Sequence, residues 1–452
     1  LRVHDNPTLV NAAKDAKKHV IPFYIEEDPF IRGANRRNFE LECLADLDKS
    51  LKDKFKSKLV YFTKGGGNAK LTDMVLSTLS KKCGVTAVYY EKDFDPVNKS
   101  RDAVAAKAAQ RLNIRMQGFT GHTMLDLQKV INKPKFSPPQ SMKNIENIFI
   151  AEFGKDYVNN IPKPLPVPKS IPSLPASAKS LGGAIPKPTK SKSGQREKYF
   201  PGGEAEAMKR LKRRVEQEIK FISTFEKPRT KSTNNEKDPF EPHTTGLGPY
   251  ITQGALSIRK FWHAINDCMK KAKTVGATPS KPPMSLHGQL LFREQFYILG
   301  LAIPNFESTK NNAMCKDIKW SPKNEKFLKA WETGNTGYPF IDALMRQLNQ
   351  TGFVHHLGRH ACACFLTRGD LYQSWIWGRD VFEKLLLDAD WSLNNANWLW
   401  LSGTAPFSSP YFRVYNPAPD KKSSLNADTS TGLFVKTFVR FVFYALTEVH
   451  FS

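Results

Sequence analysis

The chain has 452 residues, enough for two or more domains of ordinary size. It contains 68 Lys and Arg against 43 Asp and Glu, a formal charge of +25, which favours a polyanionic partner such as nucleic acid. A basic surface with Lys-rich linkers is the alternative explanation. No apolar run is long enough to cross a bilayer, and the six cysteines form no CxxC pair, which excludes a membrane-spanning protein and a small disulfide-stabilised secreted one.

The first 130 residues predict an α/β domain. Short apolar runs at 19–25, 58–63 and 85–90 are typical of buried strands, and amphipathic runs of helical periodicity separate and follow them at 38–55, 70–83 and 98–112. This alternation predicts a doubly wound parallel sheet with helices on both faces. The three glycines at 65–67 belong to no GxGxxG or GK[ST] motif, so we interpret them as a flexible turn.

Residues 131–200 are rich in proline, lysine and serine and predict an extended linker on the surface. The basic run at 209–214 could act as a nuclear import patch, but its surroundings favour a helix with a solvated basic face. Residues 201–452 predict an all-α domain that can enclose a large planar ligand. Its helices are expected at 203–225, 254–272, 285–301, 338–350, 355–366 and 378–387.

The region 352–400 gathers tryptophans, histidines and carboxylates within predicted helices. His356 and His360 are four residues apart, so on a helix they share one face and can act on one ligand. A pair of buried histidines and half of a metal site are the alternatives. A zinc hydrolase would carry Glu after the first histidine, where this chain has Leu357.

Three segments of this region carry a family resemblance. LLLDADWSLNNANWLWLS, GFVHHLGRHACACFLTRGD and TGYPFIDALMRQL resemble the flavin-binding helical domain of the photolyase and cryptochrome superfamily, most closely (6-4) photolyases and animal-like cryptochromes. The resemblance extends from LRVHDNP at Leu1 to about Pro419. It implies an α/β antenna domain, which can hold a folate or deazaflavin chromophore, and a helical domain that binds flavin adenine dinucleotide (FAD).

The resemblance also implies which residues contact FAD. Taken alone, HTTGLGPY would be an ordinary helix N-cap with Thr245. Matched to the family motif, it supplies flavin contacts, although Gly248 stands where the family has serine. Asn394 matches the residue that faces the flavin N5, and an amide there can hydrogen-bond a protonated N5. The implied FAD contacts are Thr244, Thr245, Leu247, Gln289, Arg293, Arg359, Asp388, Asp390 and Asn394.

The histidine pair and four aromatic residues also match family positions. The resemblance makes His360 the expected proton donor to a (6-4) lesion, with His356 as its partner; the sequence alone does not separate their roles. Phe292 replaces a lesion-stacking tryptophan. The electron-transfer chain is expected to run from the flavin to the surface through Trp398, Trp375, Trp320 and Tyr372.

The expected function is repair of (6-4) photoproducts in UV-damaged DNA by a monomeric protein in the nucleus or an organelle. A photoreceptor that signals to protein partners is the first alternative, and a non-enzymatic nucleic-acid-binding protein is the second. His356 argues against a cyclobutane-dimer photolyase. Because the chain begins with Leu inside the family's first strand, we expect a preceding segment. The family pattern continues into further helices after Val439, whereas this chain continues with RFVFYALTEVHFS and ends, so we expect a helical domain that is truncated at its C-terminus.

Overall fold

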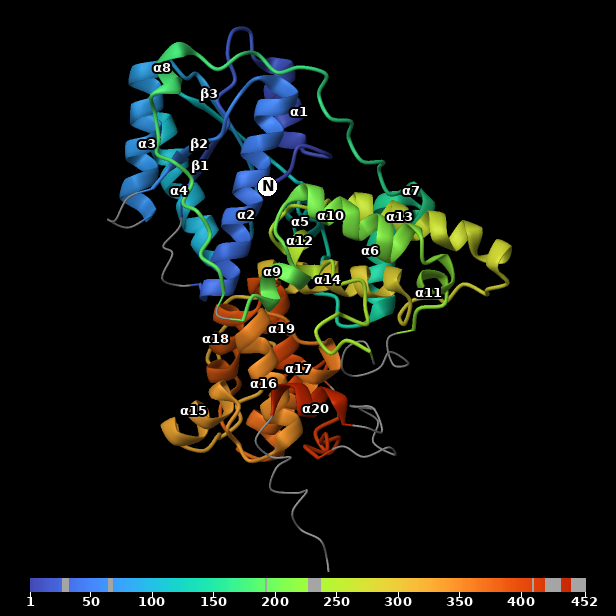
Figure 1. Cartoon of the computed structure of the whole chain (residues 1–452). Helices are drawn as coiled ribbons and strands as arrows, with labels where there is room; N and C mark the ends of the chain where they lie inside the picture. The colour runs from blue at the N-terminus through green and yellow to red at the C-terminus, as the bar shows by residue number, and fades with distance from the viewer. Residues whose placement is uncertain are drawn as a thin grey trace, which may run out of the picture.

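The structure is a computed structural model, and it describes residues 1–26, 32–63, 68–191, 193–226, 237–408, 410–418 and 432–439. The predicted turn at 65–67 lies outside these residues. An α/β unit occupies one end of the molecule, and the helices that carry the histidine and tryptophan motifs occupy the other (Figure 1).

The α/β unit alternates strands with helices, as predicted. Its strands pair in parallel, β1 (Phe23–Ile25) with β2 (Val60–Phe62) and β3 (Ala87–Glu91) with β4 (Arg115–Phe119). The two pairs are not hydrogen-bonded to each other within the described residues, so the single continuous sheet that we expected is not observed there. The helices of this unit are α1 (Pro7–Asp15), α2 (Ala34–Phe55), α3 (Asn68–Cys83) and α4 (Pro96–Arg111).

Strand β4 was not predicted, because RMQGF alternates polar and apolar residues only weakly and stays largely accessible to solvent. The buried core of the unit lies between the strands and the helices that cover them. Val88 of β3 packs with Leu76 of α3 and with Ala108 of α4, and Val60 of β2 packs with Val75 and Leu79 of α3. The helices therefore hold both strand pairs in place.

The segment predicted to be an extended linker contains a regular helix, which corrects that expectation. Helix α6 (Met142–Phe153) begins at Ser141, whose hydroxyl accepts a hydrogen bond from the Asn144 N–H at 3.3 Å. Ile145 and Phe149 are buried in the core that this helix shares with α14. Proline enrichment on both sides concealed the helical pattern. Beyond it the chain is extended and crosses back over the α/β unit through the short α8 (Ala176–Lys179) (Figure 1).

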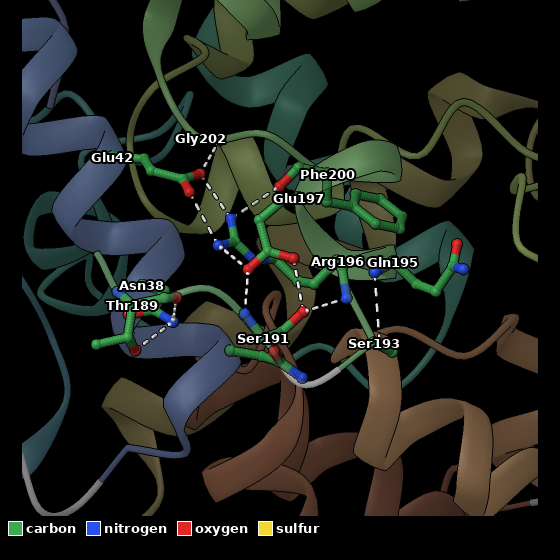
Figure 2. Close-up of polar contacts among 12 residues, drawn as sticks. Asn38, Glu42, Thr189, Ser191, Ser193, Gln195, Arg196, Glu197, Phe200 and Gly202 are labelled. Carbon is green, nitrogen blue, oxygen red and sulfur yellow. Dashed lines mark hydrogen bonds and ion pairs between the residues drawn. The ribbon is translucent and has the colours of Figure 1, made fainter. Parts of the chain in front are cut away.

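The end of this segment is fixed to helix α2 by polar contacts (Figure 2). Arg196 is buried and pairs with Glu42 at 2.6 Å and with Glu197 at 3.0 Å. Asn38 Oδ1 accepts a hydrogen bond from the Thr189 N–H at 3.1 Å. Because a buried guanidinium is costly without partners, these contacts fix where the segment enters the helical domain.

The helical domain confirms most of the predicted helices. The basic run at 209–214 lies in α10 (Glu204–Leu211) and the π-helical turn that follows, and its Arg210 is buried. The helices α15 and α19 were not among the predicted ranges. The longer helices are α13 (Ile258–Lys271), α14 (Leu286–Ala302), α15 (Glu325–Thr333), α16 (Pro339–Thr351), α17 (His356–Cys364), α18 (Trp375–Leu385) and α19 (Trp391–Leu401).

The segment after Pro419 contributes one described helix, α20 (Leu433–Phe438). Phe434 and Phe438 are buried against α16, and the Phe438 ring lies 4.9 Å from that of Phe240. Arg346 of α16 donates a hydrogen bond to the Phe438 carbonyl at 3.3 Å. Helix α20 therefore packs as part of the domain, whereas the tail RFVFYALTEVHFS at 440–452, which we expected to depart from the family pattern, lies outside the described residues.

His287 at the start of α14 makes the stability of the fold sensitive to pH. Burial lowers the pKa of this imidazole to about 4 from an ordinary value near 6.5. The unfolded chain therefore takes up a proton as pH falls below about 6.5, while the folded chain resists it. This contribution to stability is complete above pH 6.5 and is lost towards pH 4.

We expect the free energy of unfolding to fall by about 3 kcal/mol between pH 7 and pH 4 from this residue. Urea titrations across this pH range give the free energy of unfolding of the wild type and of His287→Leu. The prediction is tested by the difference between the two proteins in how steeply this free energy changes with pH. The exposed His19 provides a control, because His19→Leu should keep the wild-type slope. Equal slopes in all three proteins would contradict the prediction.

Candidate functional site

An ion pair between α17 and the loop before α19 lies at the centre of the site. Arg359 Nη2 donates to Asp388 Oδ2 at 3.0 Å, and its Nε donates to the Val354 carbonyl at 2.8 Å. Among the described residues, the buried Asp388 Oδ1 has no hydrogen-bond donor. A Cβ at Gly248 would lie 2.8 Å from Asp388 Oδ2, so only glycine lets the backbone before α12 (Gly248–Thr252) approach this carboxylate so closely.

The HTTGL segment leads directly into Gly248 and α12. Arg214 donates to the carbonyl oxygens of His243 at 3.3 Å and Thr244 at 3.1 Å, which fixes the backbone ahead of α12. Thr245 and Leu247 are buried next to it. The helix that follows them contacts Asp388: Gly248 lies against its carboxylate, and the Thr252 hydroxyl donates to its backbone carbonyl at 3.4 Å.

Helix α14 contributes Gln289 and Arg293. Gln289 is partly accessible and donates to the Pro283 carbonyl at 3.0 Å, whereas Arg293 is buried and lies over the Tyr297 ring at 4.6 Å. These two predicted contacts differ in environment: Arg293 is fixed inside the domain, and Gln289 lies near the surface.

Asp390 is held in a buried polar cluster. Its Oδ1 caps α19 by accepting from the Leu393 N–H at 3.1 Å, and its Oδ2 accepts from the Tyr297 hydroxyl and lies 3.5 Å from His122 Nε2. Burial opposes its ionisation, but hydrogen bonding by His122 and Tyr297 and the charge of Arg293 outweigh burial and lower the Asp390 pKa. Both carboxylate oxygens thus already have protein partners, which the motif alone did not indicate.

Asn394 lies one turn into α19 and is oriented by α18. Its amide nitrogen donates to the Arg379 carbonyl and to Glu383 Oε2, each at 3.0 Å. Because both contacts use the nitrogen, the amide oxygen is the atom that would meet an N–H group of a ligand. Glu383 also accepts from Arg36 of α2 at 2.9 Å, and the same guanidinium donates to the Ala389 carbonyl at 2.9 Å.

The two histidines share one helix face, as predicted. The His356 and His360 rings lie 5.9 Å apart on α17. His360 Nδ1 lies 3.3 Å from the Tyr415 hydroxyl, and the His360 ring packs against Trp400 at 5.5 Å. Burial raises the pKa of Tyr415, so its phenol stays protonated at neutral pH. These contacts place two aromatic neighbours beside the expected proton donor.

The expected electron-transfer residues extend from the core to the surface. A Cβ at Gly378 would lie 2.1 Å from Trp398 Cη2, so α18 lies directly against that indole, and Trp375 is on the same helix three residues earlier. Trp398 and Trp375 are fully buried. Trp320 and Tyr372 lie 5.2 Å apart, and Tyr372 is 44% exposed, so the outer end of the series reaches solvent.

Phe292 lies one turn from Phe296, 6.4 Å away, and Phe296 packs on Phe407 at 6.0 Å. These rings connect α14 to the segment that carries Tyr415. Sequence reasoning did not identify Tyr415, Trp400, Tyr297 or His122 as site residues. Tyr297 could have been found, since it lies one helical turn after Arg293, whereas the other three depend on tertiary contacts.

No group of three or more His, Cys, Asp or Glu side chains in the part of the chain that the structure describes could hold a metal ion. No helix there is both long enough and apolar enough to cross a membrane. The six cysteines are all free.

Comparisons with known proteins agree with this geometry. Residues 285–442 match the family model described as the FAD binding domain of DNA photolyase, and residues 1–169 match the model described as DNA photolyase. Cryptochrome-1 of Macaca fascicularis is 36% identical over 439 residues, covering 92% of this chain and 69% of its own length. The (6-4)DNA photolyase of Oryza sativa subsp. japonica is 35% identical, covering 92% of this chain and 75% of its own length.

The fold also matches solved structures. A cryptochrome from Synechocystis superposes with a TM-score of 0.80 at 22% identity, covering 97% of this chain and 86% of that one. This likeness supports the overall fold, with its helical domain and parallel strand pairs. Together with the two family models and the curated relatives, it shows that the chain belongs to the photolyase and cryptochrome family.

Proposed function

We propose that the protein uses light and reduced FAD to repair (6-4) pyrimidine–pyrimidone photoproducts in DNA. The observation that carries the proposal is the polar arrangement on α17, where His360 lies 3.3 Å from the Tyr415 hydroxyl and shares a helix face with His356. Repair of this lesion moves an oxygen-containing group between two bases, which requires a proton donor in addition to an electron donor.

The residues present fit FAD. Asp388 Oδ1 is buried without a donor among the described residues, and an acceptor of this kind is satisfied when a ligand N–H binds it. The glycine at 248 keeps the space beside Asp388 free of a side chain. Arg359 and Asp388 would flank the flavin, Asn394 would face its N5, and Thr245 and Arg293 would contact the rest of the dinucleotide. When bound and reduced, FAD supplies the electron for repair after it absorbs light.

The side chains of this chain would hold the proton and position the lesion. The Tyr415 hydroxyl lies 3.3 Å from His360 Nδ1 and would help to hold the imidazole that delivers a proton to the lesion. Trp400 packs on the same ring and limits its rotation. Phe292 would offer a flat surface on which a flipped base can stack. Positioning by these rings would therefore precede proton transfer.

The net charge supports DNA as the partner. With 68 basic against 43 acidic residues, the protein can neutralise several phosphates and release their counterions. We expect the logarithm of the binding constant for a lesion-bearing duplex to fall linearly with the logarithm of salt concentration, with a slope of roughly −0.9 per phosphate contacted. Fluorescence anisotropy at several salt concentrations measures this slope. A salt-independent affinity would argue against DNA as the partner.

The test of function is blue-light repair of an oligonucleotide with one (6-4) photoproduct by FAD-loaded protein. Light-dependent return of the intact bases, absent in a dark control, is the expected result. A matched oligonucleotide with a cyclobutane dimer provides the specificity control and should remain unrepaired. Failure to repair the (6-4) lesion by protein that binds FAD would reject the proposal.

A light-sensing role is the second candidate. The tryptophan series that ends at the exposed Tyr372 favours it, since such a series can separate charge across the domain after light absorption. A light-dependent change in protease sensitivity or in partner binding, in protein that does not repair DNA, would support signalling over repair.

A further inference from the structure

Arg379 places a positive charge beside the middle tryptophan of the electron-transfer series. Its guanidinium carbon lies 5.6 Å from the centre of the Trp375 ring, one helical turn away on α18. Trp375 is completely buried, and the Arg379 side chain is only 14% exposed. Water therefore screens this charge weakly.

The position of the guanidinium is fixed by hydrogen bonds on several sides. Nη1 donates to Asn395 Oδ1 at 2.7 Å and to the Glu307 carbonyl at 2.9 Å, while Nε donates to Asp380 Oδ1 at 2.7 Å. Asn395 is buried in α19, which packs side by side with α18 (Figure 1). The cation is therefore held next to Trp375 and is not a mobile surface charge.

The only counter-charge that contacts Arg379 among the described residues is Asp380, whose side chain is 57% exposed. An exposed carboxylate is strongly screened by water and compensates a fixed buried charge only in part. Asn395 is neutral, and Glu307 contributes only its backbone carbonyl. A net positive potential therefore remains at the Trp375 indole.

We propose that Arg379 acts as an electrostatic barrier to electron flow through Trp375. Once Trp398 has given an electron to light-excited, oxidised FAD, an electron from Trp375 would restore Trp398 and leave a positive charge on Trp375. That charge would form next to a fixed guanidinium, which opposes the step. For a unit charge at 5.6 Å in an effective dielectric near 20, the repulsion at Trp375 corresponds to roughly 100-fold in an equilibrium constant, and compensation by Asp380 and the repulsion already present at Trp398 reduce the net shift.

This inference rests on the proposed FAD chemistry and deepens it. With a barrier at Trp375, the positive charge stays on Trp398 until the electron returns to it from FAD, and the charge does not reach Trp320 and Tyr372. It leaves unchanged the route from reduced FAD to a bound lesion, which does not use Trp375. Arg379 thus biases the protein towards repair and against the long-lived charge separation that light sensing needs.

The test is transient absorption of the FAD-loaded full chain with oxidised flavin. The yield of the long-lived radical at Trp320 or Tyr372 should be low in the wild type and rise by about 10-fold in Arg379→Met, since Asp380 compensates part of the full effect. Arg379→Gln removes the charge but can still donate hydrogen bonds, so it should match Arg379→Met. Arg379→Lys keeps the charge and should restore the low yield.

An unchanged yield in both neutral variants, or a high yield in the lysine variant, would overturn the barrier. A second measurement needs no flavin: urea unfolding of Arg379→Met, Trp375→Phe and the double variant should give a non-zero coupling free energy between the two residues. Zero coupling would also overturn the proposal. Failure to bind FAD or to oxidise Trp398 in the wild type would instead reject the proposed function and leave this coupling intact.

Discussion

Replacing His360 by alanine is expected to lower the rate of (6-4) repair by at least about 100-fold, because it removes the proton donor that the reaction requires. FAD binding and light-driven reduction of FAD should remain at the wild-type level, since no FAD contact that we propose involves His360. Single-turnover repair assays, with the FAD absorbance recorded on the same samples, measure both quantities.

Tyr415→Phe is the matched variant for this prediction. It removes the hydroxyl that lies 3.3 Å from His360 Nδ1 but keeps the ring, so we expect a smaller loss of roughly 10-fold in the repair rate. Undiminished repair by His360→Ala would show that the proton comes from another group. Loss of FAD from the same variant would show that His360 supports the fold and not the chemistry.

Replacing Asp388 by alanine is expected to weaken FAD binding by about 100-fold. The substitution removes the buried acceptor at Oδ1 and leaves the partly buried Arg359 without its carboxylate, and truncating one member of such a pair costs several kcal/mol. Titration of the purified apoprotein with FAD, followed by flavin fluorescence, gives the dissociation constant.

Glu325→Ala is the control for Asp388→Ala, because the Glu325 side chain is 77% exposed and lies on α15, outside the proposed FAD site. Glu325→Ala removes one carboxylate from the protein and leaves the Arg359–Asp388 ion pair intact, so the FAD affinity of this variant should equal that of the wild type. If Asp388→Ala bound FAD as tightly as the control, the placement of the flavin beside this ion pair would be wrong.

Periodicity predicted the helices better than the strands. In α14 and α16 the buried apolar positions repeat over several helical turns, so the sequence pattern is strong. Strand β4 is five residues long and largely accessible to solvent, so its sequence carries almost no alternation of apolar and polar residues. Helix α6 was concealed by the prolines around it. The division of the sheet into two strand pairs depends on hydrogen bonds between strands, which no local pattern encodes.

In the candidate site too, local spacing predicted some residues, and only the folded structure revealed others. The His356 and His360 pair follows from helical spacing, because four residues make one turn. Tyr415 lies 55 residues further along the chain from His360, and His122 is far from Asp390 in sequence, so only the folded chain brings them together. The resemblance supplied most of the proposed FAD contacts; the buried partners of Asp390 came from the structure alone.

The contact of Arg36 with Glu383 and Ala389 has a consequence for how the protein can be divided. Arg36 belongs to the α/β unit, yet its guanidinium fixes the carboxylate that orients Asn394 and the backbone between Asp388 and Asp390. The helical domain alone, cut near residue 200, would lose this support. The α/β unit is therefore a structural component of the proposed flavin site, and separating the two domains would remove that component.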